Sequence, residues 1–275
     1  MYIALAVWVG LLVQAYRKGS YWLFAIFGIG ILLVLNVGYF INGVPDSIAF
    51  FIGIYDVLDN LGTNGAPALA SCPDNACSVW GDRYTNHPSW GVAFHDRFAN
   101  GPDMRSTLLY GHLGMNTIVF VLMHVQLAWQ GYGEHKRSHS ILGKISFACL
   151  TVGTVCAVVL ASQHGDVTSY GGSLSTYGFW FMSLCVYGCA VMGVLAIRNG
   201  DHANHRIWMI RFVGAMWGAY WLFRVMLFVL GPLLRQWDSA AILSCIWFSA
   251  PLGILIAEFV RRKLIIGHSA KLQSA

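Results

Sequence analysis

The stretch that decides the fold is Asp201–Arg224, with the sequence DHANHRIWMIRFVGAMWGAYWLFR. It begins with two histidines and an arginine, continues through aromatic and small residues, and ends at Arg224. A helix rises about 1.5 Å per residue, so this run is long enough to cross a bilayer, with His205 and Arg224 roughly 28 Å apart at opposite faces. Because an ionisable residue inside hydrocarbon is costly, such residues are candidate functional residues.

Composition identifies the class of protein. Of the 275 residues, 57% are hydrophobic and only 11% are charged, and the mean hydropathy is +0.59. Soluble domains carry about 25% charged residues, so this chain has too little charge to cover a water-facing surface. The net charge of +5 is spread along the chain and does not indicate a nucleic-acid partner. The composition therefore predicts an all-α, polytopic integral membrane protein.

Seven apolar runs predict about seven transmembrane helices. They are Tyr2–Tyr16, Tyr21–Phe40, Tyr110–Trp129, Ile141–Ala161, Thr176–Ile197, about Arg206–Leu233 and Ile242–Val260. Short links make the third to sixth helices antiparallel neighbours in a bundle. The chain is thus expected to divide into two N-terminal transmembrane helices (1–40), an external cap loop with an interfacial helix (41–109), a four-helix membrane core (110–233), and a last transmembrane helix with an inner tail (234–275).

The placement of basic residues predicts the orientation. With the N-terminus outside and the C-terminus inside, 12 of the 17 Lys and Arg residues fall on the inner side, as the positive-inside rule requires. A bacterial plasma membrane or an organelle inner membrane fits this pattern. At the inner end of the last run, Glu258 is spaced to pair with Arg261 or Arg262 on a helix.

The loop 41–109 holds the pair of cysteines that could be covalently linked. Cys72 and Cys77 lie in a polar stretch, CPDNAC, and could close a small disulfide on an oxidising side of the membrane. The other five cysteines lie in apolar runs and are expected to be inert packing residues. Several aromatic residues in the loop favour an ordered cap over a flexible linker.

The part of the chain from about 111 to 224 resembles a family of predicted membrane proteins catalogued as domain of unknown function twenty-three-oh-six. Four motifs carry the resemblance in order: His112-Leu113-Gly114 with a later Gln126, Arg137-Ser138-His139-Ser140-Ile141-Leu142-Gly143-Lys144, Gly171-Gly172, and His205-Arg206-Ile207-Trp208-Met209-Ile210-Arg211 with a later Arg224. No activity is established for that family. The resemblance therefore implies a fold and a set of important positions, not a reaction.

Histidines and arginines fall in two layers of the predicted core. The outer layer holds His112, His164 and Arg224, and the inner layer holds His124, His139, His205, Arg206 and Arg211. Because imidazoles on facing helices can supply both axial ligands of a haem iron, the pattern favours a redox-linked protein that binds haem b or a quinone. In that hypothesis the metal ligands come from His112, His124, His139 and His205, and the arginines hold propionates or other anions.

A structural interpretation of the same residues stays open. His112 and His124 are twelve residues apart and point some 120° apart on a helix, at about 100° per residue, and no CxxCH attachment motif occurs. His139 and His205 could bond helix-end carbonyls, and the arginines could bind lipid phosphates. The alternative function is a non-catalytic accessory or scaffold subunit of a bioenergetic membrane complex, contacting membrane lipids, pigments or other subunits.

Close helix packing is predicted within Asp201–Arg224. Gly214 and Gly218 form a GxxxG pattern, which lets two helix backbones approach. We expect packing against another helix of the same chain in preference to dimerisation.

Overall fold

The computed structural model describes residues 2–41, 103–129, 136–162, 173–233 and 238–273. Almost all of these residues are helical, and none of them lies in a strand. The elements are α1 (Tyr2–Lys18), α2 (Trp22–Ile41), α6 (Asp103–Trp129), α7 (Lys136–Ala161), α8 (Ser173–Arg198), α9 (His202–Trp217), the π-helical segment η2 (Gly218–Leu222), α10 (Phe223–Leu233) and α11 (Asp238–Gln273). The all-α prediction is confirmed for this part of the chain.

Four helices are long and apolar enough to cross a membrane: Met104–Trp129, Arg137–Ala161, Leu174–Arg198 and Leu243–Arg262. Large apolar side chains face outward on them, including Leu184 (66% exposed) and Leu255 (65% exposed). An outward-facing apolar surface of this kind is suited to lipid rather than to water. The protein is therefore a membrane protein.

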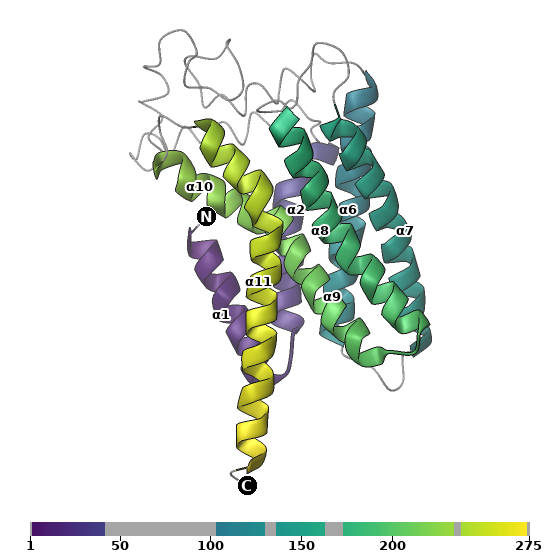
Figure 1. Cartoon of the computed structure of the whole chain (residues 1–275), viewed down its shortest axis with the longest axis vertical. Coiled ribbons are helices and arrows are strands. Elements are labelled where there is room, and N and C mark those ends of the chain that lie inside the picture. Colours follow the sequence, from purple (N-terminus) through teal and green to yellow (C-terminus); the bar gives the residue numbers. More distant parts are fainter. Residues whose placement is uncertain (1, 42–102, 130–135, 163–172, 234–237, 274–275) are drawn as a thin grey trace.

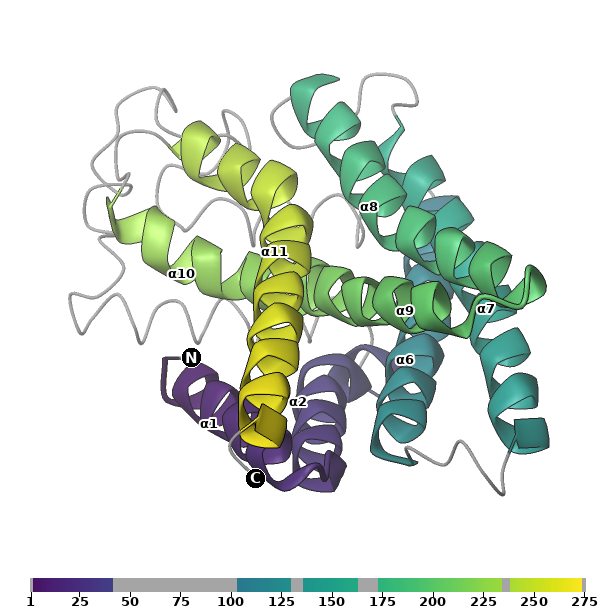
Figure 2. The ribbon, with the colours of Figure 1, turned by 60° about the horizontal axis from the view of Figure 1, so that its bottom comes forward.

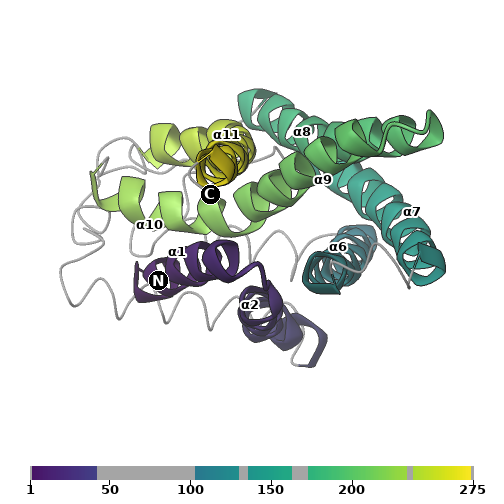
Figure 3. The same ribbon diagram turned by 90° about the horizontal axis from the view of Figure 1, so that it is seen from below.

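The predicted count of seven spans is not confirmed. The apolar parts of α1 and α2 are short, covering Ala6–Ala15 and Trp22–Leu33. The expected sixth span is divided into α9, η2 and α10, because the backbone widens to a π-helix at Gly218–Leu222. Figure 3 shows α6 and α11 nearly end-on, whereas α9 and α10 lie across the view.

Several helices extend beyond the apolar runs that predicted them. The helix that contains the run Tyr110–Trp129 begins at Asp103, and the one that contains Ile141–Ala161 begins at Lys136. The last helix continues to Gln273. In each case a helix runs past the end of its apolar stretch into polar residues, which hydropathy alone assigns to loops.

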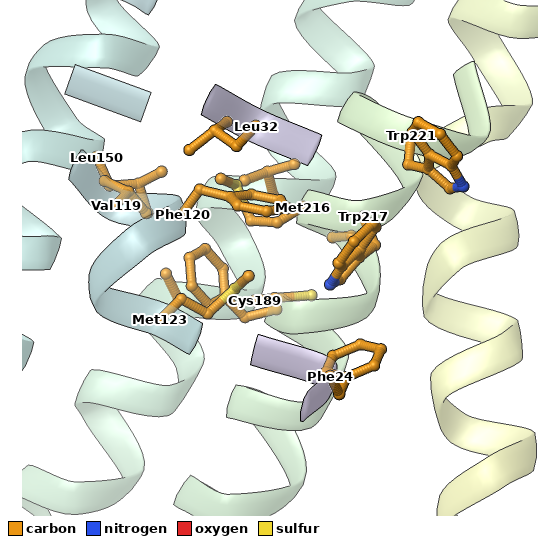
Figure 4. Close-up of a cluster of buried hydrophobic side chains, with 14 of the residues drawn as sticks. Phe24, Leu32, Val119, Phe120, Met123, Leu150, Cys189, Met216, Trp217 and Trp221 are labelled. Carbon is orange, nitrogen blue, oxygen red and sulfur yellow. The ribbon is translucent and has the colours of Figure 1, made fainter. Parts of the chain in front are cut away.

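Two groups of helices meet at α9. One pairs α6 with α7 and α2, and the other packs α9 between α8 and α11. Figures 1 and 2 show that the stretch where α9 continues into α10 passes behind α11. The buried core between them contains Val119, Phe120 and Met123 of α6 with Met216 and Trp217 of α9 (Figure 4).

The predicted close packing of Gly214 and Gly218 occurs within the chain. A Cβ at Gly218 would overlap the Ser249 carbonyl of α11, and one at Gly214 would lie 2.5 Å from the carbonyl oxygen of Gly253. Only glycine allows α9 and α11 to approach this closely.

Candidate functional site

His124 lies in an aromatic enclosure near the centre of the bundle. Its side chain is 0% exposed. The centroid of its ring lies 4.4 Å from that of Phe120 and 5.4 Å from that of Trp217. Phe24 of α2 stacks at 5.8 Å, and Trp8 of α1 lies against Trp217 at 4.9 Å. Rings from α2 and α9 therefore enclose the imidazole together with Phe120, and Trp8 of α1 packs behind them.

Three histidines share one hydrogen-bonding pattern. Each Nδ1 atom lies within hydrogen-bond distance of a backbone carbonyl oxygen: His112 to Gly153 at 3.1 Å, His124 to Phe120 at 2.7 Å and His205 to Gly193 at 2.8 Å. A carbonyl only accepts, so each of these bonds requires a ring proton on Nδ1. At His112 the side-chain amide nitrogen of Asn116 also lies 3.0 Å from Nδ1. This tautomer is the one that backbone carbonyls fix in metal-bound histidines.

His124 nevertheless does not fit a haem. A Cβ built on Gly28 would lie 2.5 Å from its Nε2, so α2 covers that atom. Among the described residues Nε2 has no hydrogen-bond partner. An iron ligated there would need a porphyrin plane between His124 and Gly28, where the helix backbone already lies. The fully buried imidazole is therefore packed, not poised for ligation.

A chain of polar side chains links α2, α6 and η2 in the same bundle. The hydroxyl of Tyr220 donates to Oδ1 of Asn36 at 3.1 Å, and Nδ2 of Asn36 donates to Oγ1 of Thr117 at 3.0 Å. The hydroxyl of Thr117 donates onward to the Leu113 carbonyl at 2.6 Å. Asn36 is only 4% exposed, so both groups of its amide are satisfied without water.

Arg224 lies beside this chain, one turn beyond Tyr220. Its guanidinium carbon is 4.4 Å from the centroid of the Tyr220 ring, and Nη1 donates to the Tyr220 carbonyl. It is also within electrostatic range of Tyr39 and His112. We call Asn36, His112, Thr117, Tyr220 and Arg224 the Arg224 cluster.

The π-helical segment positions the cluster. Its extra residue per turn, at Gly218–Leu222, shifts the register of the side chains that follow. Tyr220 lies within the segment and Arg224 lies just after it. π-Helical turns of this kind occur frequently at functional sites.

A second polar contact region lies where α6, α7, α8 and α9 meet. Nε2 of Gln126 donates to the carbonyl oxygen of His139 at 3.1 Å, and His139 interacts electrostatically with His205. The bond from Gln126 joins α6 to α7, and the bond from His205 to Gly193 joins α9 to α8. His139 and His205 lie within electrostatic range of each other across these two pairs of helices.

No group of three or more His, Cys, Asp or Glu residues within the described ranges is placed to hold a metal ion. The prediction of a haem, which needs only two imidazoles, is not tested by this observation.

Comparisons with known proteins place no constraint on the function. Neither protein-family models, nor curated proteins, nor solved structures match this chain. The resemblance to the family of unknown function therefore stays a prediction.

The structure places the predicted site residues in several different locations. His112 and Arg224 belong to the Arg224 cluster, His139 lies within electrostatic range of His205, and His124 lies in its aromatic enclosure. Arg206 is exposed, and Arg211 pairs with Glu258. His164, Cys72 and Cys77 lie outside the described residues.

Sequence reasoning missed Asn36, Thr117 and Tyr220. The sequence did contain a signal for Asn36, because it is the one amide in the apolar run Tyr21–Phe40. An amide in hydrocarbon needs a hydrogen-bond partner. Tyr220 gave no such signal, since tyrosine is common at membrane interfaces.

Proposed function

We propose that this is a redox-linked integral membrane protein that binds the head group of a membrane quinone at the Arg224 cluster. The observation that carries the proposal is that the guanidinium of Arg224 has few hydrogen-bond partners in the described part of the chain. Arg224 has five N–H donors, yet its hydrogen bonding within the described part of the chain is to the Tyr220 carbonyl, and no carboxylate there forms an ion pair with it.

A positive charge in a low-dielectric bundle requires an oxygen acceptor. A quinone supplies two carbonyl oxygens and a flat ring, and it partitions into the membrane. The aromatic surroundings suit such a ring, because Phe120 lies 5.2 Å from Tyr220 between centroids. In the Nδ1–H tautomer, His112 offers Nε2 as an acceptor for a quinol hydroxyl. Arg224 would thus orient the carbonyl form and His112 the hydroxyl form.

Quinone content of the purified protein tests this proposal. The protein is reconstituted in nanodiscs with a defined quinone, washed, extracted and analysed by chromatography. We expect bound quinone above that of empty nanodiscs. Loss of one charge-assisted bond costs about 1.5–3 kcal/mol, so Arg224→Gln should weaken binding about tenfold or more. Arg198→Gln, which removes an exposed arginine at the end of α8, is the matched control.

Equal quinone retention by wild type, Arg224→Gln and empty nanodiscs would overturn the proposal. A reduced-minus-oxidised absorption spectrum of the same sample tests the haem hypothesis in parallel, because haem b gives Soret and α bands.

A scaffold subunit is the second candidate function. The observation that favours it is the use of polar side chains as ties between helices: His112 joins α6 to α7, and His205 joins α9 to α8. Co-purification of the protein with a larger membrane complex, without bound quinone, would support this alternative.

We also infer that α1, α2, α6, α7, α8 and α11 each cross the membrane and that α9, η2 and α10 together form one further crossing. The N-terminus would lie outside and the C-terminus inside. The support is the alternating direction of successive helices in Figure 1. The C-terminal ends of α1 and α8 lie at the same, lower end of the molecule in Figure 1 and carry Arg17, Lys18 and Arg198, as an inner face would. Labelling of single cysteines placed at residues 18 and 199 tests this orientation, since both should be protected in sealed cells.

A further inference from the structure

One carboxylate in α11 is surrounded by three guanidinium groups. Nη2 of Arg261 lies 2.5 Å and Nε of Arg262 2.9 Å from Oε1 of Glu258. Nε of Arg261 donates to Oε2 at 3.0 Å, and Nε of Arg211, from α9, lies 3.3 Å from the same oxygen. We call these four residues the Glu258 cluster.

The cluster has more positive charge and more donors than its carboxylate can satisfy. Three guanidinium groups and one carboxylate leave two net positive charges. The hydrogen bonds to Glu258 use Nε of each arginine and one Nη of Arg261. The Nη groups of Arg211 and Arg262 therefore make no hydrogen bond to any described residue. Planar guanidinium donors of this kind match phosphate oxygens in bidentate geometry.

The position of the cluster specifies the source of the phosphate. Arg261 and Arg262 close the apolar span Leu243–Arg262, so the cluster lies where hydrocarbon ends. The Arg262 side chain is 69% exposed, whereas those of Arg211 and Arg261 are 27% and 17% exposed. Trp208 packs beneath Arg211, with the guanidinium carbon 4.6 Å from its ring centroid, and tryptophan is enriched at the head-group level of membranes.

We propose that the Glu258 cluster binds the phosphate of an anionic phospholipid head group. Glu258 preorganises the arginines, since it holds guanidinium groups from α9 and α11 side by side and leaves Nη donors of Arg211 and Arg262 available to a phosphate. Without it, three positive charges would repel one another. The lipid would thereby bridge α9 and α11 at the membrane surface.

Lipid titration of nanodisc-embedded protein tests this site. Binding of phosphatidylglycerol is followed by native mass spectrometry and by the rise in thermal stability over phosphatidylcholine alone. Removal of one basic residue near an anionic leaflet should weaken binding about fivefold, so Arg211→Gln and Arg262→Gln should each do so. Arg198→Gln should have no comparable effect. Inorganic phosphate, added in place of the lipid, should not reproduce the stabilisation.

Glu258→Gln separates lipid binding from a purely structural ion-pair network. It removes the negative charge that holds the three arginines together and raises the net positive charge of the cluster. The proposal predicts a protein that is less stable in phosphatidylcholine and regains stability on addition of phosphatidylglycerol. If Glu258→Gln is too unstable to purify, lipid binding by Arg262→Gln alone tests the proposal. The Arg262 side chain is largely exposed, so this substitution should leave the protein folded. Equal phosphatidylglycerol binding by wild type and Arg262→Gln, or equal losses in Arg262→Gln and Arg198→Gln, would overturn the proposal.

Discussion

Gly28 of α2 lies directly against the imidazole of His124 in α6. A methyl group in place of the Gly28 hydrogen would lie 2.5 Å from Nε2 of His124 and 2.9 Å from Cζ2 of Trp217. This contact makes α2 part of the bundle core, because it seats two buried aromatic rings against a helix backbone. It also explains why a glycine stands in the middle of an otherwise bulky apolar run.

Gly28→Ala should therefore destabilise the protein. Both neighbouring rings are buried and close-packed, so the added methyl cannot be accommodated without moving α2, at a cost of roughly 1–3 kcal/mol. Gly30→Ala is the matched control, because a Cβ there meets nothing within 4 Å. Unfolding in a mixed-detergent titration should distinguish the two variants. Similar stabilities for both would contradict the contact.

The hydrogen bond between Tyr220 and Asn36 should appear as a coupling free energy. In a double-mutant cycle of Tyr220→Phe and Asn36→Ala, we expect a coupling of about 0.6 kcal/mol, the average for interhelical bonds in a membrane protein. Tyr187, whose hydroxyl bonds Thr151 at 3.2 Å, provides the control. A cycle of Tyr187→Phe with Asn36→Ala should be additive, and equal coupling in both cycles would argue against a direct bond.

Local patterns in the sequence predicted the contacts that are local. Composition and hydropathy predicted the helical membrane fold, and the spacing of Glu258, Arg261 and Arg262 predicted ion pairs that the structure confirms. The third arginine of the cluster, Arg211, could not be predicted from local spacing. It lies 47 residues from Glu258 and joins the cluster only through the packing of α9 on α11.

The candidate site could not be predicted from helical periodicity, because it depends on a π-helical turn and on contacts between helices that are distant in sequence. Expectation of a regular helix over Arg206–Leu233 ignored the π-helical turn that sets Tyr220 and Arg224. Helical spacing showed that His112 and His124 diverge, but the aromatic rings around His124 come from α2 and α9, which are distant in sequence. The pairing of Asn36 with Thr117 spans 81 residues.

Gly253→Ala should separate α9 from α11. A Cβ at Gly253 would overlap the Gly214 carbonyl and lie 2.8 Å from the Cα atom of Gly218. Because both obstacles are backbone atoms, no side-chain rotation can relieve them, and the loss should be about 3 kcal/mol, the upper part of the overpacking range. Gly188→Ala, with nothing within 4 Å of its Cβ, should be tolerated. Thermal unfolding checks both, and an unaltered midpoint for Gly253→Ala would contradict this packing.

Asp201 should give the start of α9 a dependence on pH. The Asn204 backbone N–H donates to Oδ1 at 2.9 Å and its side-chain amide to Oδ2 at 2.6 Å, and these bonds hold the pKa of Asp201 below its usual range. A carboxyl whose pKa is lower in the folded state stabilises it above the unfolded pKa of about 4. That contribution is lost as pH falls through the folded value.

Asp201→Ala should accordingly unfold at a lower temperature than wild type at neutral pH, and the two midpoints should converge on acidification below about pH 4. Comparing wild type with the variant at each pH cancels other titrations, including that of Glu258. Asn199→Ala, which changes the preceding turn but not the cap, should lie parallel to wild type across the range. A gap between wild type and Asp201→Ala that stays constant with pH would mean that the cap does not act through the charge of its carboxylate.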